Sequence, residues 1–195
     1  MKTILKHIAS QNNFNCLDSK PLSGGDINEV FLLNCSEENF VVKINSASKF
    51  PAMFEAEASG LRLLKQNSGF KIPAVIAKGI YQNTAYLILE YIFPGNPSKN
   101  FLEKFAEALA CLHKTTAKNF GLDHDNYIGS LPQQNNFCSS ASEFYITQRL
   151  EPQFKMAADN GFNFKNLEKF FKNISEEISN EAPALVHGDL WYGNY

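Results

Sequence analysis

The sequence predicts an α+β fold with a small, strand-rich N-terminal lobe and a mainly helical C-terminal lobe. Three observations support this. Short apolar runs with strand character flank a single helical pattern in the first half of the chain. Residues 93–97 then read Phe-Pro-Gly-Asn-Pro, which neither a helix nor a strand can continue through. Every regular pattern after that point has the helical period. We therefore expect two domains, 1–93 and 94–195, with the second incomplete.

The N-terminal lobe is expected to contain one helix among four strands. Phe54, Ala58, Leu61 and Leu64 share one face of a helix over 54–65. Gly79 and Asn83 are expected to supply turns. Strands are expected at 30–33, 40–44, 73–76 and 86–92, of which the first two form a hairpin.

The C-terminal lobe is expected to contain helices joined by one long loop. Ser140 and Glu143 have the spacing of a capping box, and Pro152 is expected to stop or kink the helix that they begin. The remaining features are an amphipathic stripe over 101–112, the loop at 119–139 and a second stripe over 167–178.

Composition excludes several classes of partner. Lysine and arginine total 18 against 20 acidic residues, so no overall field attracts nucleic acid or anionic lipid. No apolar run is long enough to span a membrane, and the N-terminus has no signal-peptide core, so we expect a soluble, cytoplasmic chain. The four cysteines lack Cys-x-x-Cys spacing, and we expect reduced, mostly buried thiols. They are Cys16, Cys35, Cys111 and Cys138.

The densest chemical pattern is His187-Gly188-Asp189, with Asn194 five residues after the aspartate. Phosphoryl transfer needs a carboxylate that accepts the proton of a hydroxyl group and an oxygen ligand for magnesium. Asp189 and Asn194 are candidates for these two roles. The alternative is an ordinary turn, in which Asp, Asn and Gly are common.

Lys43 and Glu57 are predicted to form an ion pair. Lys43 is a lone cation in an apolar strand, and Glu57 lies on the inward face of the following helix. A buried charge needs a partner, and a lysine that holds ATP phosphates needs a carboxylate to orient it. The alternative is an edge-strand lysine that points to solvent.

Two further segments are candidates for nucleotide binding. Gly24 and Gly25 precede the first hairpin strand, where free backbone N–H groups can cover phosphates; the alternative is a simple turn. The strand at 86–92 ends at the predicted boundary, where backbone groups of Glu90, Tyr91 and Ile92 can bind the edge of an adenine. An ordinary central strand explains these last residues equally well.

In this order, the motifs resemble those of protein-kinase-like phosphotransferases and, more narrowly, of the fructosamine kinase (ketosamine 3-kinase) family. The resemblance implies a two-lobe kinase-like fold and phosphorylation of the sugar 3-hydroxyl of ketosamines, with ATP and Mg²⁺ as cofactors. Ketosamines are the adducts that glucose or ribose forms with small amines or with the amines of proteins, which are then glycated. The phosphorylated product releases the amine, which is deglycation repair. The matching stretches are 23–28, 54–58, 87–92, 126–129, 143–145 with 149–150, and 187–194.

By the same resemblance, Lys43 holds the ATP phosphates, Glu57 anchors Lys43 and Asp189 is the catalytic base. Asn194 is a magnesium ligand. Trp191 lies against the sugar of the substrate; the alternative is a tryptophan in the core.

The family pattern continues past the point where this sequence stops, with an Asp-Pro-Ala segment and further helices. We therefore expect the 195-residue chain to be catalytically impaired and marginally stable. We also expect it to expose apolar surface where those helices would dock. Two alternatives to a ketosamine kinase follow. One is a remnant that at most binds nucleotide, and the other is a phosphotransferase of the same fold that acts on a different hydroxyl substrate.

Overall fold

The computed structural model describes residues 1–23, 27–179 and 181–191. The chain forms two compact units, Met1–Leu109 and Ala110–Tyr195, which we call the sheet unit and the helical unit and describe separately. The predicted lobe boundary after residue 93 stays a prediction.

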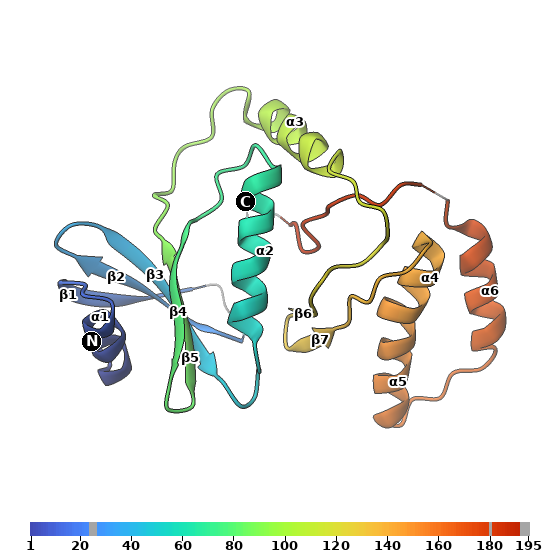
Figure 1. Cartoon of the computed structure of the whole chain (residues 1–195), viewed down its shortest axis with the longest axis horizontal. Coiled ribbons are helices and arrows are strands. Elements are labelled where there is room, and N and C mark those ends of the chain that lie inside the picture. The colour runs from blue at the N-terminus through green and yellow to red at the C-terminus, as the bar shows by residue number, and fades with distance from the viewer. Residues whose placement is uncertain (24–26, 180, 192–195) are drawn as a thin grey trace. The chain divides into compact units, whose positions relative to one another are not determined.

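The elements of each unit are shown in Figure 1. The sheet unit contains α1 (Thr3–Gln11), β1 (Cys16–Leu22), β2 (Glu29–Cys35), β3 (Asn39–Ser46), α2 (Met53–Asn67), β4 (Val75–Tyr81) and β5 (Thr84–Glu90). Helix α3 (Phe101–His113) begins in the sheet unit and ends in the helical unit. The helical unit continues with β6 (Asn126–Ile128), β7 (Leu131–Gln133), α4 (Ala141–Tyr145), the π-helical turn η1 (Ile146–Leu150), α5 (Glu151–Asp159) and α6 (Leu167–Glu177).

The five strands of the sheet unit form one antiparallel sheet in the order β1-β2-β3-β5-β4, so β3 is central. Successive side chains of a strand point to opposite faces. Phe40, Val42 and Ile44 of β3 pack in the core cluster that contains α1, whereas Val41 packs with α2. Figure 1 shows α1 and α2 on opposite sides of this sheet. The alternation therefore places Lys43 on the α2 face.

Helix α1 and strand β1 were not predicted. Leu5 and Ile8 of α1 are fully buried against the sheet. Strand β1 is largely exposed and contains Pro21, and its pairing with β2 at the edge of the sheet imposes the strand conformation. In both elements, contacts with the sheet outweigh the weak intrinsic propensity of the local sequence for a helix or a strand.

The predicted turn at Gly79 is wrong. Gly79 lies inside β4, directly opposite Tyr86 of β5, and the turn between the strands is at Gln82 and Asn83. A Cβ atom on Gly79 would lie 2.6 Å from the Tyr86 hydroxyl oxygen. Glycine is therefore required here because the Tyr86 side chain crosses the neighbouring strand.

The expectation of reduced, mostly buried cysteines is also wrong. Cys16 and Cys35 are directly opposite in the β1–β2 ladder and are joined by a disulfide. Of the other two, Cys138 is buried and Cys111 is exposed. The pairing was missed because the two residues are 19 positions apart, and strand register alone brings them together.

In the helical unit, the cap of α4 is confirmed. The Ser140 hydroxyl accepts a hydrogen bond from the Glu143 backbone N–H at 3.2 Å, and the Glu143 carboxylate accepts one from Ser139 N–H at 3.0 Å. Pro152 does not stop the helical run, which passes through the π-helical turn η1 and continues as α5. Because Pro152 has no N–H, the Gln148 carbonyl accepts instead from the Arg149 guanidinium at 2.9 Å.

Candidate functional site

Lys43 and Glu57 form the predicted ion pair, with Nζ and Oε1 2.6 Å apart. Lys43 comes from the central strand β3 and Glu57 from α2, which packs on the same face of the sheet. The edge-strand alternative for Lys43 is wrong because β3 has paired neighbours on both sides. The side chains are 28% and 25% exposed, so the pair is half-buried and open to a ligand.

A second pair of polar side chains on this face was not predicted. Asn45 Nδ2 donates to Asn28 Oδ1 at 2.9 Å and lies 3.2 Å from Met53 Sδ. A sequence signal exists, because Asn45 stands two residues after Lys43 and therefore points to the same face of β3.

The C-terminal end of β5 lies near Lys43 in the sheet. Leu87 pairs with Lys43, and Glu90 is three residues further along β5, which corresponds to about 10 Å. The Glu90 carboxylate accepts from Ala74 N–H at 3.0 Å, which ties this end to the residue before β4. Tyr91 and Ile92 follow the last paired residue, and the Tyr91 ring contacts Phe93 edge-on.

The segment that carries Asp189 is tethered within the helical unit. Leu185 N–H donates to the Thr115 carbonyl at 2.9 Å, next to an antiparallel bridge between Thr116 and Ala184. Gly188 has a φ of 83°, a conformation that favours glycine, and the Asp189 backbone N–H donates to His187 Nδ1 at 3.4 Å.

Asp189 and Trp191 are both exposed. Trp191 is 62% exposed, so the core alternative for this residue is wrong. Gly24, Gly25 and Asn194 lie outside the described residues.

A polar network in the helical unit was also missed. Arg149 donates to the Gln134 carbonyl and to Asn135 Oδ1, both at 2.6 Å, and its guanidinium lies over the Phe144 ring. Asn135 is buried, and its own amide donates to the His124 carbonyl at 3.0 Å. Burial lowers the pKa of the Arg149 guanidinium by desolvating its charged form. The network fixes the loop before α4 to the π-helical turn.

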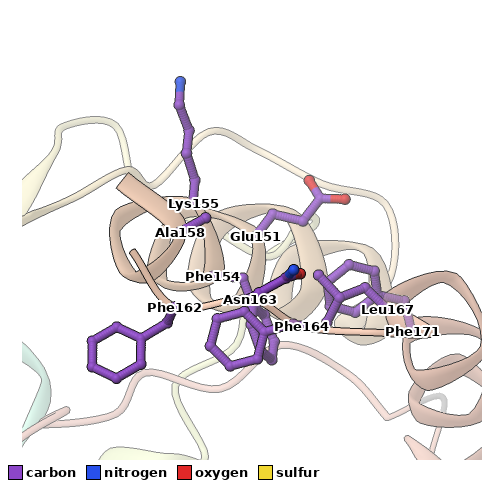
Figure 2. Close-up of a pocket in the computed structure, with 9 residues that line it drawn as sticks. All are labelled: Glu151, Phe154, Lys155, Ala158, Phe162, Asn163, Phe164, Leu167 and Phe171. Atoms are coloured by element: carbon purple, nitrogen blue, oxygen red, sulfur yellow. The ribbon is translucent and has the colours of Figure 1, made fainter. Parts of the chain in front are cut away.

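An apolar pocket of about 280 Å³ lies between α5 and α6 and contains none of the predicted site residues. Figure 2 shows phenylalanine side chains gathered in it, with Lys155 pointing away from them. The Phe154 and Phe164 rings are 4.8 Å apart, and Phe162 is largely exposed. Apolar surface is thus exposed here. That further helices would dock on apolar surface of this chain stays a prediction.

The described residues are 1–23, 27–179 and 181–191. No helix among them has the length and apolar character needed to cross a membrane. Likewise, no three or more His, Cys, Asp or Glu side chains in the described part of the chain gather in a way that could hold a metal ion.

The chain has the two-lobe kinase-like fold. It aligns with the crystal structure of a putative fructosamine-3-kinase from Haemophilus somnus with a TM-score of 0.84 and 30% identity, over 98% of this chain and 66% of that one. The profile described as fructosamine kinase matches residues 1–195, and the chain belongs to that family.

Curated relatives agree. A probable ketoamine kinase of Vibrio vulnificus is 33% identical over 93% of this chain and 64% of its own length. A probable ketoamine kinase of Enterococcus faecium is 38% identical over 89% of this chain and 63% of its own length. The chain thus spans somewhat less than two thirds of these two relatives.

Proposed function

We propose that this chain provides the nucleotide-binding and catalytic residues of an ATP-dependent ketosamine kinase. The observation that carries the proposal is the Lys43–Glu57 ion pair on the central strand of a fructosamine kinase family member. A lysine held by a helix glutamate presents a fixed positive charge, which phosphoryl transfer requires.

Nucleotide binding is assigned to the sheet unit. Lys43 neutralises ATP phosphates, and Glu57 keeps the ammonium group in place. Backbone groups of Glu90, Tyr91 and Ile92 bind the adenine edge, and the separation of about 10 Å along the sheet allows one extended nucleotide to reach both places. Gly24 and Gly25 are proposed to cover the phosphates.

Chemistry is assigned to Asp189. Its carboxylate accepts the proton of the sugar 3-hydroxyl as that oxygen bonds to the γ-phosphorus and the bond to the leaving ADP breaks. The exposed indole of Trp191 contacts the sugar face. Magnesium neutralises phosphate charge when bound. Its proposed ligand, Asn194, lies outside the described residues, so no step is assigned to the metal.

The proposed substrate is a ketosamine, free or attached to a protein amine. The 3-phosphate product releases the amine, so the reaction repairs glycation. We place this activity in the cytoplasm, where ATP is supplied.

The direct test is ATP consumption with a synthetic ribulosamine or fructosamine, measured for the 195-residue chain and for the complete product of its gene. We expect Asp189→Asn to lower kcat by about 10²- to 10⁴-fold while ATP affinity is retained. Asp159→Asn, an exposed carboxylate on α5, is the matched control and should leave kcat unchanged. Turnover that survives Asp189→Asn would show that another group is the base.

A second candidate function is nucleotide binding without transfer by this chain alone. The exposure of Asp189 and of Val186 beside it favours this candidate, because a catalytic base works best in a site that excludes water. ATP binding without turnover of ketosamines, choline or aminoglycosides would support it. Turnover of choline or an aminoglycoside alone would instead indicate a different hydroxyl substrate.

A further inference from the structure

Asn28 and Asn45 extend the β2–β3 ladder by one position. The last backbone pairs are Val30 with Lys43 and Glu29 with Ile44, so continued register sets Asn28 opposite Asn45. The Asn45 Nδ2 to Asn28 Oδ1 hydrogen bond of 2.9 Å closes this position through side chains. Because faces alternate, both amides lie on the face that carries Lys43.

Asn45 also contacts α2. Its Nδ2 lies 3.2 Å from Met53 Sδ, and Met53 is four residues before Glu57. Two residues of β3 span about 6.7 Å, and four residues of α2 rise about 6 Å. The Asn45–Met53 and Lys43–Glu57 contacts are therefore two parallel links between the same strand and helix.

The Asn45 side chain satisfies only part of its hydrogen-bonding capacity. Among the described residues, its Oδ1 atom is buried and has no hydrogen-bond partner. A buried acceptor without a partner destabilises the fold, and an apolar side chain of similar size would avoid that penalty. Asn45 carries this energetic cost next to the Lys43–Glu57 pair, which indicates that the asparagine is retained for function.

We propose that Asn45 is a positioning residue for nucleotide binding. It holds Asn28 and the start of β2 at a fixed distance from the Lys43–Glu57 pair. It acts through Asn28 and α2 and does not touch the nucleotide. This inference rests on the proposed function, since it specifies how the sheet unit keeps its phosphate-binding groups aligned.

The first test separates affinity from stability. For Asn45→Leu, we expect an unchanged or raised Tm and a Kd for MgATP weaker by on the order of tenfold, measured by calorimetry. Asn34→Leu is the matched control, because Asn34 lies on the same face of β2 and donates to the Asp18 side chain. It should leave the Kd unchanged. An unchanged Kd in Asn45→Leu, or a loss of affinity that only follows a lower Tm, would overturn the proposal.

The second test uses nearly isosteric exchanges. Asn28→Asp keeps the Asn45 Nδ2 donor opposite a carboxylate, and in Asn45→Asp the Asn28 amide turns over so that its Nδ2 donates to the new carboxylate. We therefore expect each single variant to bind MgATP within about threefold of the unmodified chain. The double variant sets two carboxylates face to face. We expect the Kd of the double variant for MgATP to rise by clearly more than the product of the two single-variant factors. A rise equal to that product would contradict an interaction between Asn28 and Asn45.

Failure of this inference can be told apart from failure of the proposed function. Ketosamine phosphorylation that is absent both from the 195-residue chain and from the complete product of its gene contradicts the proposed function, while the affinity comparisons on a chain that binds MgATP still decide the role of Asn45. An unmodified chain that binds no MgATP overturns the inference itself.

Discussion

The two units are ordered by different interactions. Among the described residues, every buried apolar side chain except Leu112 and Cys138 lies in the sheet unit. In the same described part of the chain, the polar residues that are buried as a whole are Asn135 and Gln148, both in the helical unit and both hydrogen-bonded. Apolar burial on both faces of one sheet thus stabilises the first unit, whereas a polar network organises the loops of the second. Truncation of a buried apolar side chain should therefore destabilise the sheet unit most. Replacement of a hydrogen-bonding polar side chain should destabilise the helical unit most.

The largest effect is expected from Phe54→Ala. Phe54 is 1% exposed and anchors α2 on the sheet, so its removal should lower the free energy of unfolding by about 3–5 kcal/mol. Phe93→Ala, at a side chain that is 71% exposed, is the control and should change it by less than about 0.5 kcal/mol. Urea denaturation gives the size of the effect. Hydrogen exchange should rise in the sheet unit alone, and an equal rise in the helical unit would break the comparison.

Arg149→Met tests the helical unit. It removes three hydrogen bonds from a charged donor and leaves the buried Asn135 oxygen without this partner, so we expect a loss of about 2–3 kcal/mol. Exchange should rise in the loop before α4. Lys155→Met, at an exposed residue of α5, should have little effect. An Arg149→Met chain with unchanged exchange in this loop would show that apolar contacts order it instead.

Gly79→Ala sharpens the description of the sheet unit. The added methyl group meets the Tyr86 ring, so we expect a loss of about 1–3 kcal/mol in thermal or urea unfolding. Gly60→Ala has the opposite expected sign, because α2 leaves open space there and alanine is a better helix former by about 1 kcal/mol. Equal effects at the two positions would contradict the close approach of Tyr86 to β4.

The smallest effect is expected from Ser140→Ala. Loss of the α4 cap should lower stability by about 1 kcal/mol, and Ser140→Asp should retain it because aspartate caps equally well. Thermal unfolding of the three chains checks the order. A Ser140→Asp chain as unstable as Ser140→Ala would indicate that the hydroxyl acts through Ser142 rather than as a cap.

Periodicity predicted the parts of the site that depend on local geometry. The helical period in α2 and the rule that a buried charge needs a partner were enough to pair Lys43 with Glu57. Periodicity could not predict contacts that depend on the register between strands distant in the sequence. The Cys16–Cys35 disulfide and the Asn28–Asn45 pair both require knowledge of which residue faces which across a ladder. The Arg149 network was missed for a related reason, since its carbonyl partner belongs to a loop without a periodic pattern.

The division of β3 between two cores has an evolutionary consequence. Insertion or deletion of one residue inside the strand would turn Lys43 toward the α1 core and bring apolar side chains to face Glu57, so folding and nucleotide binding would fail together. The same length change at residues 36–38 falls in the turn outside the paired residues and leaves both registers intact. Natural insertions and deletions in this hairpin should therefore concentrate in that turn. Insertions or deletions of one residue within β3 should be rare in related sequences, because selection removes them.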